Sequence, residues 1–320
     1  MENLIKIFAG NANRPLAERI AVRVGVPLSA ASVSTFPDGE ISVIYEETVR
    51  GREVFIVQPT GLRPNEYLME LLIMADAARR ASARRITAVM PFFAYARQDR
   101  KDRSRVPISA KLVANLLVAA GVDRVLTIDL HSPQIQGFFD IPVDHLYAAP
   151  LMVRYIREQA PAADCVVVAP DPGGLKMAYS YSKLLGAGLA LAGKHRCSAS
   201  EVEALELVGN VEGRDCILTD DMTTTAGTLC AAARMAKENG ARSVRAVVSH
   251  CPITELGIQR LKESPIEELI TTDSLAQSLP WGDFPLTVLT VADLLGDAIK
   301  RIYGDESVSK LFEIHQGRMQ

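Results

Sequence analysis

The chain has 320 residues, of which 48% are hydrophobic and 23% are charged. At roughly 100 to 200 residues per domain, this length predicts two domains with enough apolar material for their cores. The formal net charge of -3 argues against a general nucleic-acid coat and a membrane-surface protein, and no apolar run approaches the roughly 18 residues of a membrane span. The N-terminus lacks a signal-peptide pattern, and the five cysteines contain no CxxC pair. We therefore expect a cytoplasmic protein with reduced thiols and no zinc cage.

Short apolar runs alternate with helix patterns along the chain. In the first half we expect strands at 4–9, 54–57, 86–90 and 125–128, a hairpin over 36–45, and helices over 16–24, 68–75 and 108–119. In the second half we expect strands at 165–169, 216–219, 244–249 and 286–290, and helices over 175–185, 228–239 and 291–302. This alternation indicates an α/β protein with a largely parallel sheet. The region 150–161 is the best candidate for a domain boundary.

Polar residues follow four of the predicted strands at the point where each strand ends. These segments are Pro91–Lys101, Asp129–His131, Asp171–Gly174 and Asp220–Thr228. In open α/β sheets, ligands bind beyond the carboxyl ends of the strands. We therefore expect one or two binding sites at this edge.

The segment that begins at Asp220 is the most specific of the four. Asp220 and Asp221 precede a Thr/Gly loop and a helix expected to begin at Thr228, so unpaired backbone N–H groups and a helix dipole would attract an anion. A phosphate fits the loop, while the two carboxylates suit vicinal hydroxyls or a metal shell, which together favour a sugar phosphate. The alternative is a plain strand–turn–helix with solvated aspartates. No Gly-Lys-Ser/Thr follows, so the segment is not a Walker loop.

Two other segments allow both a structural and a functional interpretation. Five of the nine residues from Arg97 to Arg105 are basic, which is typical of a solvated face or a nucleic-acid patch. Because the run follows three aromatic residues at a strand end in a slightly acidic protein, a polyphosphate with an aromatic base fits better. The polar segment 192–200 is either an ordinary surface loop or a mobile lid whose cations meet charge that develops during a reaction.

His131 lies two residues after Asp129, and its role stays open at this point. A lone histidine is often structural, and magnesium prefers oxygen ligands, so direct ligation by His131 would be unusual. The other histidines show no ligand spacing. No Gly-x-Ser-x-Gly elbow and no recognisable cysteine nucleophile is present, which excludes acyl transfer.

Taken together, these motifs resemble those of the ribose-phosphate pyrophosphokinase family, in the class regulated by phosphate and ADP. The likeness runs nearly from end to end. The matching segments are Phe36–Glu40, Leu68–Met74, Tyr95–Asp99, Asp129–His131, Gln134–Asp140, Pro170–Gly174, Lys194 with Arg196, Asp220–Met222, and Glu306–Ser309 before Leu311 and Phe312. The Asp-Asp loop alone would have indicated only a phosphoribosyltransferase-like protein.

The resemblance implies an α/β fold of two tandem phosphoribosyltransferase-type domains, each a mostly parallel sheet flanked by helices. Residues 1–147 would form the ATP and metal side, residues 148–304 the ribose 5-phosphate side, and residues 305–320 a C-terminal tail. The implied enzyme transfers the β,γ-diphosphoryl group of MgATP to the 1-hydroxyl of ribose 5-phosphate. The products are 5-phosphoribosyl 1-diphosphate, which is used in nucleotide biosynthesis, and AMP.

The resemblance also implies a set of site residues. ATP would be bound by Phe36, Asp38, Gly39, Glu40, Arg97 and Gln98, with Asp38 and Glu40 supplied by a neighbouring subunit. His131 and Asp171 would hold Mg²⁺ together with the ATP phosphates. Ribose 5-phosphate would be bound by Arg196, Asp220, Asp221, Thr224, Thr225, Ala226, Gly227 and Thr228. Lys194 and Arg196 would be the catalytic residues, closing over the reacting phosphorus.

Regulation and assembly are implied in the same way. Phosphate as activator and ADP as inhibitor would act at a site drawn from Arg50, Ser82, Arg84, Ser307, Ser309 and Phe312. We expect a homohexamer built from dimers, with no nucleic-acid or membrane partner.

Two positions depart from the family pattern. Position 224 is Thr where relatives usually carry Asp, so a carboxylate near the ribose is lost and substrate affinity is in doubt more than the chemistry. His195 stands between the two lid cations, where Arg or Glu is more usual.

Two alternatives stay open from the sequence. One is a non-catalytic regulatory homologue of the same fold. Four retained residues argue against it: Lys194, His131, Asp171 and Asp220. The other is a phosphoribosyltransferase that consumes the diphosphate product. That enzyme would need only the second domain and would leave the basic run from Arg97 unexplained.

Overall fold

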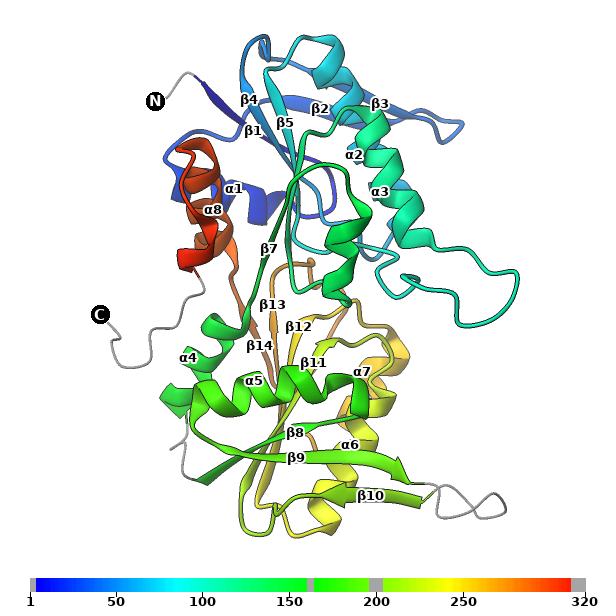
Figure 1. Ribbon diagram of the computed structural model, residues 1–320, viewed down its shortest axis with the longest axis vertical. Helices are drawn as coiled ribbons and strands as arrows, with labels where there is room; N and C mark the ends of the chain where they lie inside the picture. The colour runs from blue at the N-terminus through cyan, green and yellow to red at the C-terminus, as the bar shows by residue number, and fades with distance from the viewer. Residues whose placement is uncertain (1–3, 160–163, 196–203, 312–320) are drawn as a thin grey trace. The chain divides into compact units, whose positions relative to one another are not determined.

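The computed structural model describes residues 4–159, 164–195 and 204–311 (Figure 1). Contacts divide these residues into two compact units, each with its own sheet. Unit 1 holds residues 4–147, 274–276 and 290–311, and unit 2 holds the described residues of 148–273 together with 277–289. None of the helices in this described part combines the length and the apolar character needed to cross a membrane.

Unit 1 is built on a five-stranded parallel sheet in the order β1-β4-β5-β6-β7. Its strands are β1 (Ile5–Ala9), β4 (Glu53–Val57), β5 (Arg85–Met90), β6 (Arg124–Ile128) and β7 (Val143–Leu146). The other elements are α1 (Arg14–Val24), α2 (Pro64–Arg80), α3 (Ser109–Ala120), η1 (Pro133–Phe138), α8 (Ala292–Tyr303), η4 (Val308–Leu311) and the hairpin of β2 (Ala31–Thr35) and β3 (Ile41–Tyr45). The central strands are buried along nearly their whole length, as parallel strands covered on both faces must be.

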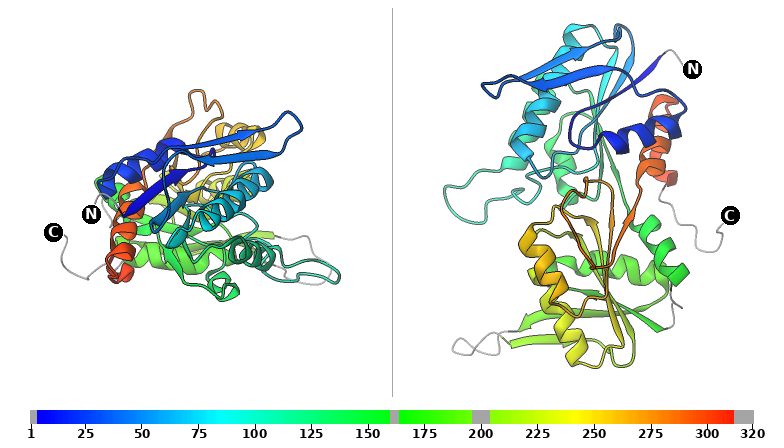
Figure 2. Two further views of the ribbon diagram at one scale, coloured as in Figure 1. Left: turned by 90° about the horizontal axis from the view of Figure 1, so that it is seen from above. Right: turned by 180° about the vertical axis from the view of Figure 1, so that it is seen from behind.

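Helix α8 belongs to unit 1, although the strand before it belongs to unit 2. It packs against α1 (Figure 2), where Arg23 Nη2 lies 2.7 Å from Asp297 Oδ2 and a Cβ on Gly296 would lie 2.5 Å from Arg23 Cγ. The contacts group α8 with α1 because an amphipathic helix is buried where its apolar face finds a partner, whatever its place in the chain. The domain limits expected from the sequence, at 147 and 304, stay a proposal.

Unit 2 is built on a seven-stranded sheet in the order β10-β9-β8-β11-β12-β13-β14, parallel except for the β9–β10 pair. Its strands are β8 (Cys165–Ala169), β9 (Gly188–His195), β10 (Ala204–Val208), β11 (Asp215–Met222), β12 (Ser243–His250), β13 (Glu268–Thr272) and β14 (Leu286–Leu289). Its other elements are α4 (Ala149–Gln159), η3 (Pro172–Gly174), α5 (Leu175–Leu185), α6 (Gly227–Glu238) and α7 (Glu255–Lys262).

Several of these elements differ from the expectations. Helix α4 covers most of the region 150–161. Residues 192–195 of the expected polar segment 192–200 belong to β9, which pairs with β10, and residues 196–200 lie outside the described residues. Strand β11 continues to Met222, so Asp220 and Asp221 lie inside it rather than after it. The patterns also missed β7, β13 and α7, which have four, five and eight residues.

The cysteines of the described chain are buried in unit 2. Cys165, Cys216, Cys230 and Cys251 are free thiols. Burial raises the pKa of Cys251 to about 12 and that of Cys216 to about 11. These thiols are therefore protonated and poor nucleophiles near neutral pH, in agreement with the absence of a recognisable cysteine nucleophile in the sequence.

Candidate functional site

Two aspartates form the carboxyl end of β11, in the middle of the sheet of unit 2. The Asp221 N–H donates to Asp220 Oδ1 over 2.9 Å. Burial raises the pKa of Asp220 to about 8, and the charges of Asp221 and Asp171 act in the same direction. The carboxyl group therefore favours its protonated form at pH 7 until a cation or a set of hydrogen-bond donors stabilises the charge. Such a group at a strand end is a candidate ligand-binding residue.

The turn after these aspartates has the form of an anion-binding turn. The Thr223 N–H donates to His250 O over 3.1 Å, and α6 begins at Gly227. Between them Ala226 has a φ of 54°, in the left-handed region that few side chains adopt. A left-handed residue directly before a helix directs successive N–H groups toward one point, and the helix dipole adds to the attraction for an anion.

Asp171 lies at the end of β8, the neighbour of β11. Its Oδ1 accepts from the Gly174 N–H over 3.1 Å, which caps the short η3 turn. No group of three or more His, Cys, Asp or Glu side chains in the described part of the chain is arranged to hold a metal ion. Magnesium is usually held by one or two carboxylates together with water and substrate phosphates, so an acidic edge of this kind has suitable donors.

Of the candidate lid residues, Lys194 lies in the strand next to the edge of the same sheet. Lys194 belongs to β9 and is paired in register with Leu205 of β10. The side chain of Lys194, and Arg196 as a whole, lie outside the described residues. Their catalytic role therefore stays a prediction.

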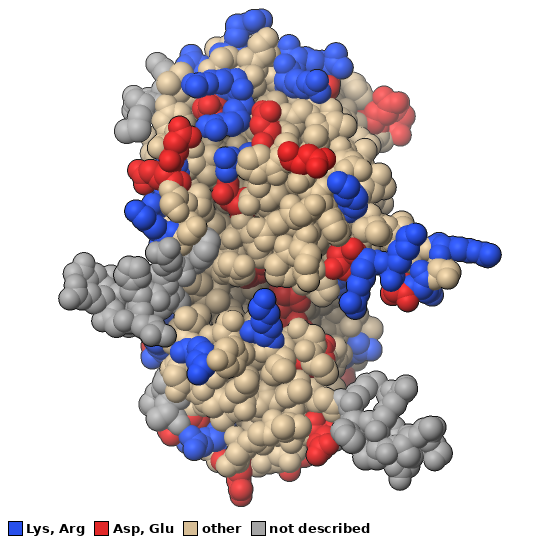
Figure 3. Space-filling view, in the orientation of Figure 1, with Lys and Arg blue, Asp and Glu red and all other residues tan. Residues whose placement is uncertain are grey.

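In unit 1, an exposed basic loop follows β5. All five of its Lys and Arg residues between 97 and 105 are exposed, and they form the projection of basic side chains at the right of Figure 3. The base of the loop is ordered by Gln98, whose N–H donates to Tyr95 O over 2.9 Å and whose Oε1 accepts from the Ser109 hydroxyl over 2.5 Å. The loop thus presents Arg97 and its neighbours to a polyanion.

The turn after β6 is held in place from β7. Asp129 is buried with a φ of 38°, and the next N–H, that of Leu130, donates to His145 Nε2 over 2.9 Å. His145 is buried and lies 4.6 Å from the Tyr147 ring, measured between centroids. This turn leaves His131 exposed beyond the end of the strand. His145 has a structural role that its sequence spacing did not reveal.

The hairpin of β2 and β3 carries the remaining ATP-binding candidates. Phe36, Asp38, Gly39 and Glu40 are exposed at its tip, which projects from the rest of unit 1 (Figure 1). The Phe36 N–H donates to Glu40 O over 2.7 Å, and Gly39, with a φ of 95°, closes the turn. Among the described residues, no hydrogen bond or ion pair joins this tip to Arg97, Gln98 or His131.

The candidate regulatory residues lie in two separate parts of the chain. Arg50, Ser82 and Arg84 lie near the amino ends of β4 and β5, where the Ser82 carbonyl accepts from the backbone N–H of residue 51 over 2.8 Å. Ser307 and Ser309 follow α8, and in the part of the chain that is described no hydrogen bond joins them to the first three. Phe312 lies outside the described residues.

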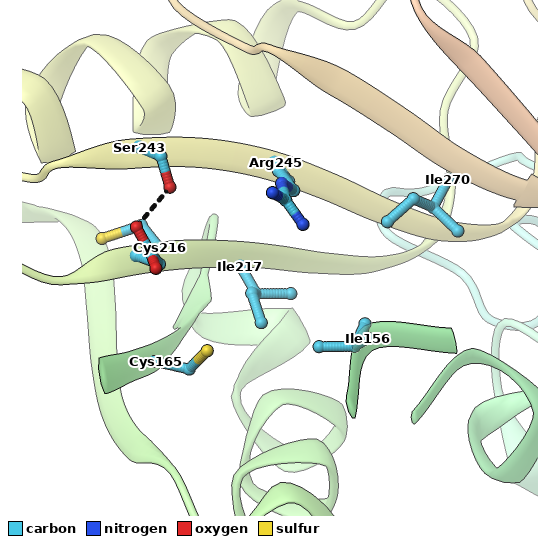
Figure 4. A pocket seen from close by; sticks show the side chains of 8 residues that line it. Ile156, Cys165, Cys216, Ile217, Ser243, Arg245 and Ile270 are labelled. Atoms are coloured by element: carbon cyan, nitrogen blue, oxygen red, sulfur yellow. Dashed lines mark hydrogen bonds between the residues drawn. The ribbon is translucent and has the colours of Figure 1, made fainter. Parts of the chain in front are cut away.

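Unit 2 contains two hollows, neither of which is lined by Asp220 or Asp221. A cavity of about 10 Å³, large enough for about one water, lies at the amino ends of β8, β11 and β12 (Figure 4). Ser243 Oγ donates there to Asp215 Oδ1 over 2.6 Å. An open groove of about 490 Å³ runs along η3 and α5, beside Lys176 and Tyr179. The cavity lies at the amino ends of the strands, whereas ligands of open α/β sheets bind beyond the carboxyl ends.

The fold and the turns at the strand ends define the class of this protein, which is a tandem pair of phosphoribosyltransferase-type α/β domains. The family model described as the N-terminal domain of ribose phosphate pyrophosphokinase matches residues 5–121, and that of the phosphoribosyl synthetase-associated domain matches residues 196–313. The crystal structure of phosphoribosylpyrophosphate synthetase from Mycobacterium smegmatis is similar, with a TM-score of 0.90 and 42% identity, covering 95% of this chain and 100% of that one.

Curated relatives agree with these matches. Ribose-phosphate pyrophosphokinase of Brucella melitensis is 49% identical over 97% of this chain and 100% of the relative. Ribose-phosphate pyrophosphokinase 2 of Enterococcus faecalis is 50% identical over 97% of this chain and 96% of the relative. The chain belongs to the ribose-phosphate pyrophosphokinase family and is an enzyme, which confirms the resemblance and the fold class expected from its motifs.

Proposed function

We propose that this chain transfers the β,γ-diphosphoryl group of ATP to the 1-hydroxyl of ribose 5-phosphate and releases AMP, as a step in nucleotide biosynthesis. The observation that carries the proposal is the carboxyl edge of unit 2. There the half-buried Asp220 precedes the turn over 223–226 and the N-terminus of α6. Carboxylates accept hydrogen bonds from vicinal ribose hydroxyls, and convergent N–H groups bind a phosphate.

The residues of unit 2 have separate roles in this proposal. Asp220 and Asp221 bind the ribose hydroxyls, and the five residues from Thr224 to Thr228 bind the 5-phosphate. Lys194 and Arg196 approach the β-phosphate and offset the charge that builds on the oxygen bridging to AMP. The 1-hydroxyl oxygen attacks the β-phosphorus in line with that bridging oxygen. The bond to the bridging oxygen breaks, AMP leaves with the electron pair, and the hydroxyl proton is lost.

The residues of unit 1 bind the donor nucleotide. Arg97 and Gln98 contact ATP from the exposed loop after β5, and Phe36, Asp38, Gly39 and Glu40 contact it from the hairpin tip of a neighbouring subunit. The projecting, exposed hairpin tip supports this assignment. An ATP site shared between two subunits requires an oligomer, and we propose a homohexamer built from dimers. We also propose phosphate and ADP as regulators.

A divalent metal suits this reaction, and we propose Mg²⁺. His131 and Asp171 would hold it, together with the phosphates of ATP. The acidic edge of β8 and β11 offers oxygen donors, and burial together with the charges of Asp221 and Asp171 raises the pKa of Asp220, so a cation at this edge would be favoured. When bound, the metal neutralises phosphate charge during the displacement.

The first experiment measures AMP release from ATP in the presence of Mg²⁺ and phosphate, with and without ribose 5-phosphate. Wild type is compared with Lys194→Ala and with Lys300→Ala, a matched loss of charge on the exposed face of α8. We expect AMP only when the sugar phosphate is present. We also expect a rate lower by orders of magnitude in Lys194→Ala and a normal rate in Lys300→Ala.

AMP release that does not need ribose 5-phosphate would contradict the proposed acceptor. ATP binding without any AMP release would favour the non-catalytic homologue. Equal rates of AMP release in wild type and Lys194→Ala would refute the proposed role of Lys194, but not the proposed reaction.

A further inference from the structure

Two consecutive carbonyl groups of the turn over 223–226 are bonded to α7 or to the residue that caps it. The Thr254 N–H donates to Thr224 O over 2.9 Å, and the Thr254 hydroxyl donates to the same oxygen over 3.2 Å. Arg260 Nη1 donates to Thr225 O over 3.2 Å. The turn is therefore attached to α7 through its carbonyl oxygens.

These bonds decide where the N–H groups of the turn point. In a planar trans peptide, the C=O of one residue and the N–H of the next point in opposite directions. Because the carbonyls of Thr224 and Thr225 face α7, the N–H groups of Thr225 and Ala226 face away from it. The first N–H groups of α6, from Gly227 and Thr228, follow directly. Among the described residues, none of these four N–H groups donates to a backbone carbonyl.

Close packing on α7 makes this orientation rigid. A Cβ on Gly257 would lie only 2.7 Å from Thr224 O and 2.6 Å from Ile253 Cδ1, so α7 approaches the turn as closely as a glycine allows. Arg260 is half-buried, and its Nη1 lies 3.4 Å from the point that a Cβ on Gly227 would occupy. The Arg260 carbonyl also accepts from Cys230 Sγ over 3.5 Å, which ties α7 to α6. The guanidinium thus fills the space between the two helices behind the turn.

We propose that Arg260 is a positioning residue for ribose 5-phosphate. It holds the Thr225 carbonyl toward α7, so that the N–H groups of the turn face the 5-phosphate. The inference rests on the proposed function and adds to it a residue outside the turn itself. The competing explanation is that the guanidinium attracts the phosphate directly by its charge, without regard to the orientation of the turn.

The test is steady-state kinetics and binding with ribose 5-phosphate and ATP, using the full-length enzyme. Arg260→Ala is expected to raise the KM for ribose 5-phosphate about tenfold, the order expected for losing a charge-assisted hydrogen bond. The KM for ATP should stay within twofold. Arg260→Lys, which keeps a donor of similar reach, should recover most of the loss. Gln259→Ala, on the exposed face of α7, is the matched control and should match wild type.

A second variant approaches the turn without changing charge. Gly257→Ala places a methyl group against Thr224 O and displaces the turn. Because the turn itself binds the 5-phosphate in the proposed function, this variant should raise the KM for ribose 5-phosphate and spare that for ATP, which shows how sensitive binding is to the orientation of the turn. Circular dichroism melting identifies the temperature range in which every variant is folded, and all titrations are made within it.

The outcomes separate the explanations. A rise of the ribose 5-phosphate KM in Arg260→Ala, by the same factor at low and at high salt, supports positioning. A rise that shrinks as salt is added overturns it in favour of direct charge attraction, which salt screens, and no rise in Arg260→Ala also overturns it. Failure of the wild type to bind ribose 5-phosphate would instead refute the proposed function, which a calorimetric titration of the wild type detects on its own.

Discussion

At the scale of single residues, the pKa of the candidate site residue Asp220 links the stability of the protein to pH. Its folded pKa of about 8 lies above the ordinary value of 3.8, mainly because the carboxyl group is buried. Between about pH 4 and pH 8 the folded state therefore binds more protons than the unfolded state, and stability falls as the pH rises through that range. Ionisable side chains with strongly shifted pKa values, which lower the stability of the folded state, are typical of binding sites.

This linkage predicts the behaviour of Asp220→Asn. In metal-free buffer, the variant should gain stability over wild type, and the gain should be larger at pH 9 than at pH 5, because only wild type carries the buried charge at high pH. Urea unfolding midpoints measure the gain. The exposed Asp283→Asn serves as control and should show no such trend. A gain of equal size at both pH values would contradict the assignment of the raised pKa to Asp220.

Thr224 supports a second prediction at this scale. Its hydroxyl oxygen is buried without a hydrogen-bond partner in the described structure, as is that of Thr219 earlier in β11. Replacing an unpaired buried hydroxyl by a methyl group is neutral or stabilising, so Thr224→Val and Thr219→Val should both unfold at or above the wild-type urea midpoint. If the Thr224 hydroxyl contacts ribose 5-phosphate, only Thr224→Val raises the KM for that substrate, by several-fold. A normal KM for ribose 5-phosphate in Thr224→Val would show that the Thr224 hydroxyl does not contribute to binding this substrate.

Some of the candidate site could be predicted from the sequence and some could not, for a physical reason. The turn after Asp220 could be predicted from the sequence, because its acids, threonines and glycine are adjacent in the chain. Arg260 and His145 act on backbone groups 35 and 15 residues away. Such partners become visible only once the sheet has brought the strands together.

At the scale of elements, the long amphipathic segments were predictable and the short or edge elements were not. The pattern over Leu175–Leu185 predicted α5 with the observed bounds. Strand β9 has small and apolar residues up to Gly193, followed by Lys194 and His195, so it shows no alternation of apolar and polar residues. Helix α7 has only eight residues, fewer than three helical turns.

The contact between β7 and the turn after β6 supports a prediction about His145. Its Nε2 accepts the buried Leu130 N–H, so His145→Ala leaves that N–H without its partner. We expect a loss of about 1–3 kcal/mol in the free energy of unfolding, measured by urea denaturation. His145→Gln offers an oxygen at similar reach and should recover part of the loss. Equal destabilisation by both variants would show that packing of the ring, rather than the hydrogen bond, is what matters.

At the scale of the whole molecule, chain order and spatial order differ. Unit 1 is completed by α8, which returns after the chain has passed through unit 2. Helix α8 buries Leu295, Ile299 and Ile302, and α1 buries Leu16 and Ile20. Each such side chain contributes about 1.5–3 kcal/mol when buried, so exposing even part of this apolar surface would remove a large share of the about 5–15 kcal/mol that stabilises a typical domain.

A fragment of residues 1–147 should therefore fail to fold cooperatively on its own, because the face of α1 that packs on α8 would be exposed. Joining residues 290–311 to it through a flexible linker should restore a cooperative thermal transition, monitored by far-UV circular dichroism. The same fusion carrying Ile299→Asp should not restore it, since a buried, unpaired carboxylate cannot replace the apolar contact. If the fragment 1–147 melts cooperatively without the added segment, then α8 covers a unit that is already complete. The sequence-based limit at residue 147 would then mark the end of a self-sufficient domain.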